Sequence, residues 1–182
     1  MEEKIRAFIS IEIPIDAVNE IKKIQENIKG KFSFNGKFTE FENLHLTLKF
    51  LGEIPEDKME KVKEILREIK IQEFNAHLGE LGLFSEKVPR ILWIELKGAD
   101  KLQKELDMKL GDIFEKEHRF MGHITIARIK YIKEKEELLK YLRNLKSVIN
   151  FSVNKFYLKK SELRDKGPIY TSIGEYLLGK EK

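Results

Sequence analysis

The sequence contains no cysteine. That absence excludes a disulfide-stapled scaffold, a thiol nucleophile, a zinc ribbon and a cysteine-ligated iron–sulfur cluster. Long apolar runs are also missing, because no stretch approaches the roughly 18–20 residues that a membrane span needs. Residues 1–14 alternate apolar and polar side chains, whereas a secretory signal needs a continuous apolar stretch. We therefore expect a cytoplasmic protein without a membrane partner.

Glycine and proline are few and scattered, with 11 and 4 in 182 residues, so no linker or low-complexity tract divides the chain. The length suits one domain, or two small lobes that share an interface. The net charge is 35 − 31 = +4, a balance that permits nucleic-acid binding without establishing it. Charged residues make up 36%, mostly Lys and Glu, which resembles proteins from hot environments.

Apolar periodicity predicts strands and helices that interleave along the whole chain. Strands are predicted over 5–13, 44–51, 73–84, 90–97, 123–129, 150–160 and 169–178. Helices are predicted over 14–30, 56–70, 99–117 and 133–146. Because some successive strands have no helix between them, the order does not enforce a parallel sheet of βαβ units. We expect an α+β fold with mostly antiparallel sheets.

Two copies of one short pattern stand out. The chain has four His and four Thr, so random placement gives about 4 × 4/182, or roughly 0.1, pairs with a Thr two residues after a His. Two such pairs occur, His45-x-Thr47 and His123-x-Thr125, separated by 123 − 45 = 78 residues. Both lie in predicted strands with similar neighbours, which indicates an internal duplication. We expect residues 1–182 to form a single domain of two pseudo-symmetric lobes.

The spacing of the pattern has a chemical meaning. Residues i and i+2 of a strand point to the same face, so each copy presents an imidazole beside a hydroxyl. If the two strands are neighbours, both imidazoles and both hydroxyls converge on one cleft. One imidazole can then take a proton from an attacking oxygen while the other gives a proton to the leaving oxygen, since the imidazole pKa is about 6.5. The hydroxyls of Thr47 and Thr125 can hydrogen-bond the phosphoryl oxygens of a substrate.

The pattern has two other interpretations. A single His-x-Thr on a strand is usually structural, with Thr present for its strand propensity, but two copies in matching context weaken that interpretation. A metal site needs more ligands than two His, and neither His-x-His nor His-Glu-x-x-His occurs in the sequence. We therefore expect neither a metal nor a cofactor.

At these residues the chain resembles the two-histidine (2H) phosphoesterase superfamily, which is defined by paired His-x-Thr-x motifs. Within the superfamily it is most similar to the RNA 2′,3′-cyclic phosphodiesterases long named 2′-5′ RNA ligases, over nearly its full length. The segments that carry the resemblance are Arg6–Pro14, Asn43–Glu53, Pro89–Trp93, His123–Arg128, Ser161 and Gly167–Tyr170. The resemblance implies a bilobal α+β fold, with two mostly antiparallel sheets and flanking helices around a central cleft.

The family's extended motifs, His-x-Thr-x-x-Phe and His-x-Thr-x-x-Arg, also match this chain. By resemblance, His45 is the general acid that protonates the ribose 3′ oxygen, and His123 is the general base that activates water. Arg128 clamps the phosphate, which its forked guanidinium suits, and Phe50 stacks on the terminal base. The implied activity is metal-independent hydrolysis of RNA 2′,3′-cyclic phosphate ends to 2′-phosphomonoesters.

Strict strand alternation conflicts with two of these roles. It places Phe50 and Arg128 on the faces opposite their histidines, so each strand must bulge or twist just after its Thr if both residues serve the cleft. Otherwise Phe50 packs in the core and Arg128 forms a surface ion pair. In addition, Gly122 stands before the second motif where the family commonly has Pro, and a Gly is expected to loosen the start of the strand.

Residues outside the motifs carry weaker indications. Trp93 alternates with apolar neighbours and is predicted to lie in the core. Basic residues at Lys29, Lys31 and Lys37, and again between Lys155 and Lys166, could contact an RNA backbone. Either group could equally protect a strand edge against aggregation.

The expected partner is RNA with a 2′,3′-cyclic phosphate end, such as a tRNA fragment, and the expected state is a monomer. Two alternatives stay open at this point. The same His pair could serve a 2′-5′ RNA ligase, in which a ribose hydroxyl replaces water as the nucleophile. A non-catalytic RNA- or nucleotide-binding module is the other alternative. The sequence contains no Gly-x-x-x-x-Gly-Lys-[Ser/Thr] loop, so it gives no indication that ligation would need a nucleotide.

Overall fold

The computed structural model describes residues 4–85, 90–165 and 167–180, so Pro89 and Lys166, named above, lie outside the described residues. The strands are β1 (Lys4–Glu12), β2 (Phe34–Phe38), β3 (His45–Pro55), β4 (Phe74–Phe84), β5 (Ile91–Lys97), β6 (His123–Ile132), β7 (Asn150–Val153), β8 (Lys155–Arg164) and β9 (Gly167–Leu177). The helices are α1 (Ile15–Lys31), α2 (Glu56–Arg67), α3 (Asp100–Lys109) and α4 (Lys135–Asn144), with a short 3-10 helix η1 (Phe41–Asn43).

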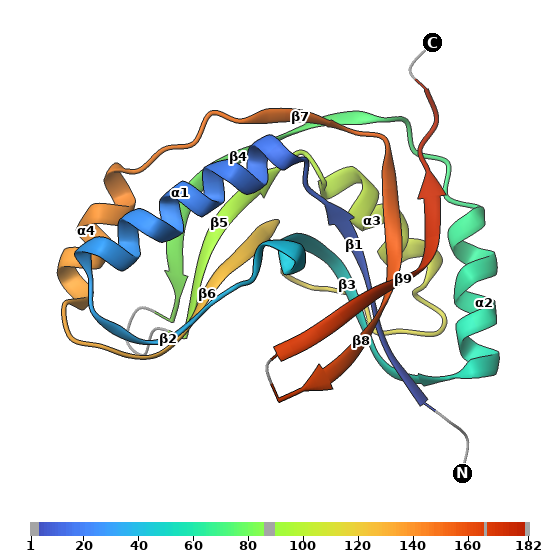
Figure 1. Cartoon of the computed structure of the whole chain (residues 1–182). Helices are drawn as coiled ribbons and strands as arrows, with labels where there is room; N and C mark the ends of the chain where they lie inside the picture. Colours follow the sequence, from blue (N-terminus) through green and yellow to red (C-terminus); the bar gives the residue numbers. More distant parts are fainter. Residues whose placement is uncertain (1–3, 86–89, 166, 181–182) are drawn as a thin grey trace.

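The strands form one sheet, so the expectation of two sheets is wrong. Its order is β7-β4-β5-β6-β3-β1-β8-β9, with β2 paired to β6, and every strand pair is antiparallel. The motif strands β3 and β6 unite the two halves, because they pair at Leu46 and Ile124. The two halves diverge on either side of this contact, and the sheet curls strongly (Figure 1). The predicted α+β class with antiparallel pairing is confirmed.

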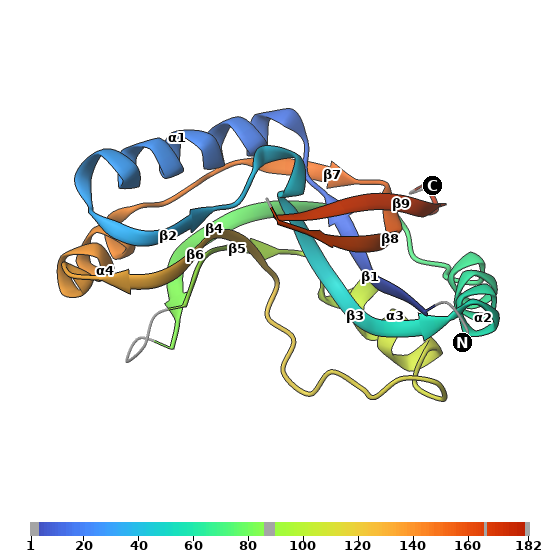
Figure 2. The same ribbon diagram turned by 60° about the horizontal axis from the view of Figure 1, so that its bottom comes forward.

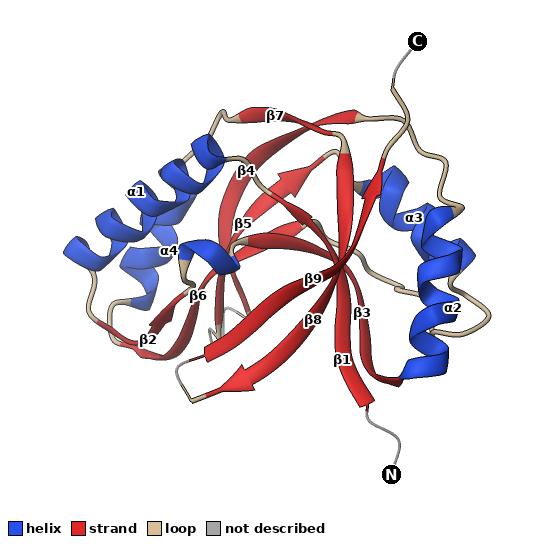
Figure 3. Ribbon diagram, turned by 45° about the vertical axis from the view of Figure 1, so that its right-hand side comes forward, coloured by secondary structure: helices blue, strands red, loops and turns tan. Residues whose placement is uncertain are grey.

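The helices lie in two pairs at the ends of the curled sheet. Figure 3 shows α1 and α4 at one end and α2 and α3 at the other. The hairpin formed by β8 and β9 has its tip beside η1 (Figure 2), where Asn43 Nδ2 donates a hydrogen bond of 3.2 Å to the carbonyl oxygen of Pro168. This contact links the C-terminal hairpin to the residues that lead into the first motif.

The predicted elements are found with shifted ends, and β2 and η1 were missed. The predicted helix over 99–117 ends at Lys109, because the chain then turns back and the carboxylate of Asp107 accepts the N–H of Glu117 at 2.6 Å. The predicted strand over 150–160 is divided into β7 and β8. The segment that contains β2 has no clear alternation, since Gly36 and a register shift beside it interrupt the pattern.

The core lies under the face of the sheet opposite to the motifs. Alternate residues of β1, namely Ala7, Ile9 and Ile11, are buried in it. The even-numbered residues of β1 therefore share the other face with His45 and Thr47, their neighbours on β3. The apolar alternation seen in the sequence thus fixes which side of the sheet is available for chemistry.

Candidate active site

The two motif strands repeat each other residue by residue. Over ten positions starting at His45 and at His123, β3 and β6 show the same succession of half-buried, buried and exposed side chains. In both strands the His and the Thr are half-buried, while the residue between them is fully buried. The two copies found in the sequence are therefore two copies of one local structure.

Each strand also bulges at the same place. Against β1, Thr47 and Lys49 have consecutive partners, so Leu48 is an extra residue without one. Against β5, Ile126 is the extra residue at the corresponding position of β6. Because one extra residue reverses the alternation, side chains beyond the bulge change faces. The bulge that alternation requires if Phe50 and Arg128 serve the cleft is present in both strands.

The bulges turn Phe50 and Arg128 to the exposed side of the sheet. Phe50 is 73% exposed, which excludes core packing for this side chain. The ring of Phe8 lies 4.9 Å from the ring of His45 and 6.3 Å from that of Phe50, so Phe50 and His45 share a face.

Lys49 is turned into the protein by the same bulge. Simple alternation placed it beside His45, but its side chain is buried, pairs with Asp107 of α3 and donates to the carbonyl oxygen of Glu115 at 2.7 Å. Burial by itself raises the pKa of Asp107, but the hydrogen bonds from Lys49 and from the N–H of Glu117 outweigh it and lower that pKa. The buried charge is tolerated because it is paired.

The two imidazoles are held in the same way. Nδ1 of His45 donates to the carbonyl oxygen of Asn43 at 2.7 Å, and Nδ1 of His123 donates to that of Met121 at 2.8 Å. Because a carbonyl oxygen can only accept, Nδ1 carries the hydrogen in both rings. Nε2 is thus the atom that can gain or lose a proton, and in His45 it lies 3.1 Å from Oγ1 of Thr47.

The surroundings of His45 favour its neutral form. Burial lowers its pKa to about 4; the hydrogen bond to Asn43 and the charge of Glu12 oppose the decrease, while Lys159 and His123 add to it. The effect of His123 on this pKa places the two imidazoles within electrostatic reach of each other. At pH 7 the unliganded His45 is a neutral imidazole whose Nε2 can accept a hydrogen bond.

Aromatic rings line the site on both sides. Tyr170 lies edge-on to the ring of His45 at 5.2 Å, and Phe84 lies edge-on to the ring of His123 at 4.8 Å. Trp93, predicted to lie in the core, is instead half-buried opposite Thr125 and contacts Phe84 at 5.5 Å. Its position follows from alternation on β5, where its neighbours in sequence take the core side.

Arg128 reaches the same place from β6. Burial raises the pKa of Tyr170, and the positive charges of Arg128 and Arg6 oppose that rise. Since Tyr170 touches His45, both guanidinium groups lie near the first motif. Arg6 was noted in the sequence only as part of a matched segment, and it adds a second cation on the motif face of β1.

Gln25 and Asn43 support the site in ways that the sequence did not reveal. Nε2 of the buried Gln25 donates to the carbonyl oxygens of Thr39 and of Ile126, both at 2.9 Å, which ties the second bulge to α1. Asn43 holds His45 through its backbone and Pro168 through its side chain. For Gln25 the sequence did contain a signal, because a polar Gln stands on the apolar stripe of the helix predicted over 14–30.

Gly122 is closely packed rather than loose. Its carbonyl oxygen accepts the N–H of Leu96 at 2.9 Å, and a Cβ at position 122 would lie 2.3 Å from the carbonyl oxygen of Leu96. A side chain there forces a shift of β5, so the close approach of two backbones explains a Gly at this position.

In the part of the chain that the structure describes, no helix is long and apolar enough to cross a membrane. The described residues also contain no group of three or more His, Cys, Asp or Glu side chains that could hold a metal ion.

Two imidazoles held through Nδ1, each beside a Thr on a bulged strand of one antiparallel sheet, define a two-histidine phosphoesterase. The family model of LigT-like phosphoesterases matches residues 11–93 and 95–170, with His45 in the first segment and His123 in the second. The chain belongs to this family.

Similar proteins agree with this assignment over nearly the whole length. The chain is 38% identical over 178 residues to the RNA 2′,3′-cyclic phosphodiesterase of Methanocaldococcus jannaschii, covering 94% of this chain and 99% of that protein. It is 36% identical over 188 residues to the protein of the same name from Aquifex aeolicus, covering 96% and 98%.

Solved structures show the same fold. A crystal structure of a protein from Thermus thermophilus has a TM-score of 0.85 at 24% identity, covering 97% of this chain and 100% of that one. The apo structure of E. coli LigT has a TM-score of 0.79 at 21% identity, covering 97% and 99%.

Proposed function

We propose that this chain is an RNA 2′,3′-cyclic phosphodiesterase, which hydrolyses cyclic phosphate ends to 2′-phosphomonoesters. The names and full-length similarity of the relatives support the substrate class. The observation that carries the chemistry is the matched orientation of two imidazoles, both with Nδ1 fixed by a backbone carbonyl and Nε2 available. Two proton-transfer groups on one face are what the reaction needs.

In the proposed reaction, a water oxygen attacks the phosphorus atom of the cyclic phosphate. Nε2 of His123 takes a proton from this water as the new P–O bond forms. The bond from phosphorus to the ribose O3′ breaks, and Nε2 of His45 gives its proton to O3′. The product has a free 3′ hydroxyl and a 2′-phosphate, and the two imidazoles have exchanged protonation states.

The proposed acid must carry a proton at the moment of reaction, although its pKa is about 4 in the free protein. A bound phosphodiester anion supplies the missing stabilisation, because a negative charge close to an imidazole favours the imidazolium form. Substrate binding thus loads His45 with the proton that it then donates. His123 keeps its role as base on the opposite side of the phosphate.

Four further side chains complete the proposed site. The hydroxyls of Thr47 and Thr125 bind phosphoryl oxygens between the two His residues. Arg128 binds the phosphate through its guanidinium fork, and the exposed ring of Phe50 stacks on the terminal base. The matched bulges support both assignments, since they turn Arg128 and Phe50 to the exposed face.

We also propose that residues 1–182 form one domain with two related lobes, each contributing one motif. The repeated order of exposure along β3 and β6 supports this organisation.

The test uses a 5′-labelled RNA that ends in a 2′,3′-cyclic phosphate, incubated with the purified protein in EDTA. Conversion to the 2′-phosphate by the wild type, with loss in His45→Ala and His123→Ala, supports the proposal. Adding an RNA with a 5′ hydroxyl separates ligation, because a ligated product is longer. Binding without turnover in all proteins favours the non-catalytic module instead.

A further inference from the structure

A groove lies one strand away from Arg128, between β2 and the C-terminal end of α1. It has a volume of about 660 Å³ and is lined by Lys29, Gly30, Lys31, Phe32, Ser33, Phe34, Gly36, Lys37 and Phe38. None of these lining residues is acidic. Its volume falls within the range of pockets that hold small molecules, roughly 300–1,000 Å³.

We propose that this groove binds the nucleotides that precede the cyclic phosphate in a single-stranded RNA substrate. The inference rests on the proposed function, and it adds a second contact region that extends the substrate from a single nucleotide to an oligonucleotide. Aromatic rings beside lysines are the combination that binds single strands without sequence preference.

The rings of Phe34 and Phe38 form the floor of the proposed subsite. They lie 5.1 Å apart in an edge-to-face arrangement, and both are half-buried, so part of each ring is accessible. Gly36 permits this geometry, because a Cβ there would lie 2.8 Å from the ring of Phe34 and 2.4 Å from the carbonyl oxygen of Arg128. The close approach of β2 to β6 thus leaves an aromatic surface uncovered by a side chain at position 36.

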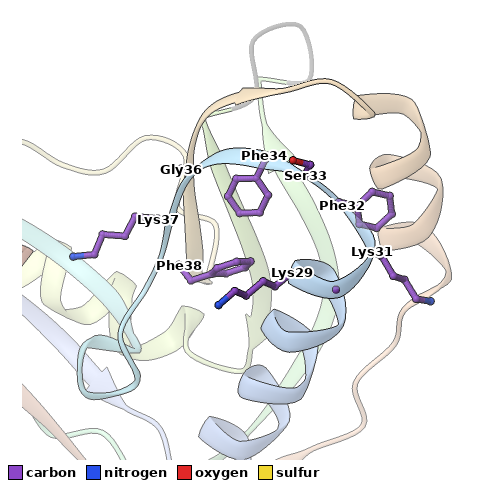
Figure 4. A pocket seen from close by; sticks show the side chains of 9 residues that line it. Lys29, Lys31, Phe32, Ser33, Phe34, Gly36, Lys37 and Phe38 are labelled. Carbon is purple, nitrogen blue, oxygen red and sulfur yellow. The ribbon is translucent and has the colours of Figure 1, made fainter.

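The lysines are arranged unequally around these rings (Figure 4). Lys29 extends beside Phe38, whereas Lys31 points away and places its ammonium 4.5 Å from the centre of the Tyr141 ring. Lys37 pairs with Glu40 and also is the register partner of Arg128. Lys37, which lines the groove, thus lies beside the proposed phosphate clamp on the neighbouring strand.

The alternative path, along the β8–β9 hairpin, is less positive. Among the described residues its basic side chains pair with carboxylates, as Lys155 does with Glu175, Lys159 with Glu12, and both Lys160 and Arg164 with Glu162. These pairs reduce the charge that the hairpin offers to phosphates. Lys37 of the groove is also paired, with Glu40, but among the described residues Lys29 forms no ion pair. The groove on β2 is therefore the more favourable exit for the RNA chain.

The experiment compares two substrates of different length, only one of which is long enough to extend from the cleft into the groove. A nucleoside 2′,3′-cyclic phosphate occupies only the proposed catalytic cleft, whereas an RNA of about eight nucleotides with the same end spans a single-strand site. In Phe34→Leu, kcat/KM for the RNA relative to the mononucleotide should fall roughly 10-fold, through KM, because one base loses its stacking partner. Leu keeps the apolar packing at this position.

Lys29→Gln provides a second variant with an exposed side chain and no role in packing. It should raise KM for the RNA about threefold and lower the slope of log affinity against log salt by about 0.7. Lys23→Gln, the same change at another exposed position of α1, is the matched control and should leave both quantities at their wild-type values. If Phe34→Leu fails to fold, the comparison of Lys29→Gln with Lys23→Gln tests whether the groove binds RNA.

Equal changes for both substrates, or an unaltered RNA KM in both folded groove variants, would overturn the proposal. Binding of a fluorescent RNA that ends in a 2′-phosphate, measured by anisotropy, separates this outcome from failure of the proposed function. Suppose that the wild type binds this RNA more tightly than Lys29→Gln does, but that the wild type hydrolyses neither substrate. The groove is then an RNA-binding site, and the proposed phosphodiesterase activity is wrong.

Discussion

Leu46 of β3 and Ile124 of β6 are register partners, and through them the two motifs come onto one surface. Continuing the antiparallel register by one residue in each direction sets each His beside the Thr of the other motif. Each imidazole then has a hydroxyl from its own strand and one from the other strand nearby. A phosphoryl group held by these hydroxyls would lie between the two Nε2 atoms, which is the geometry of acid–base catalysis.

Removing either imidazole tests this arrangement. His45→Ala and His123→Ala should each lower kcat for cyclic-phosphate hydrolysis by about 10²–10⁴, because each removes one proton-transfer group. Steady-state kinetics on a labelled RNA measures the loss. His77→Ala, at an exposed position of β4, is the control and should keep wild-type rates. Equal losses in all three variants would contradict a specific role for the motif residues.

The pKa of His45 should depend on the occupancy of the site. An NMR titration of the unliganded protein is expected to give about 4, because burial favours the neutral ring. Inorganic phosphate should raise this pKa, since an anion beside Nε2 favours the imidazolium. A titration that is insensitive to phosphate would contradict the proposed loading of the acid by its substrate.

The same pKa predicts how stability changes with pH. Because the folded-state value lies below the ordinary 6.5, the unfolded chain binds more protons between pH 6.5 and about 4. The free energy of unfolding should therefore fall as the pH falls through this window. The fall should be smaller in His45→Gln, which lacks the group, and thermal melts at several pH values compare the two. Parallel curves would rule out the shifted pKa.

The guanidinium group of Arg128 should be needed for its two parallel N–H donors and not merely for its positive charge. Arg128→Lys keeps the charge but loses the paired N–H groups, so kcat/KM should fall about 10-fold or more. Arg90→Gln, an exposed change close to β5, serves as the control. If Arg128→Lys has wild-type kinetics, a point charge is enough at this position and bidentate binding is wrong.

Alanine variants of Phe50 and Phe8 should have different effects, the first on substrate binding and the second on the free energy of unfolding. Phe50 is 73% exposed, so Phe50→Ala should leave the melting temperature almost unchanged while lowering kcat/KM about fivefold or more. Phe8 is 4% exposed, and Phe8→Ala should cost about 3–5 kcal/mol of unfolding free energy. Denaturant unfolding and steady-state kinetics on both variants give the comparison. A large loss of stability in Phe50→Ala would place its ring in the core.

Gln25 should support both the fold and the position of Arg128. Gln25→Leu removes two hydrogen bonds, one buried and one partly buried, and leaves the carbonyl oxygen of Thr39 without this donor, which should cost about 1–3 kcal/mol. We expect kcat/KM to fall as well, because the bulge that turns Arg128 outward loses its tie to α1. The same change at the exposed Gln72 is the control. Loss of stability without loss of activity would limit Gln25 to a structural role.

Much of the fold was predictable because its signals are local. Alternation of apolar residues located β1, and helical periodicity located α2 close to its observed bounds. β2 was missed because Gly36 and a register shift interrupt its pattern, and its partner β6 is distant in the sequence. The predicted length of α3 was wrong because the chain turns back after the helix. This turn is held by a tertiary contact in which Asp107 accepts a hydrogen bond from the N–H of Glu117.

The sequence by itself determined which side chains can carry the proposed chemistry. His and Thr at i and i+2 on a strand must share a face, and the repetition of that spacing made His45 and His123 the candidates without any structure. The requirement for a bulge after each Thr followed from strand alternation once the family resemblance had assigned Phe50 and Arg128 to the cleft. Tertiary structure decided what depends on long-range contacts. The pairing of Leu46 with Ile124 merged two expected sheets into one, and burial among Phe8 and Tyr170 moved the pKa of His45, because register and desolvation arise only when distant segments pack together.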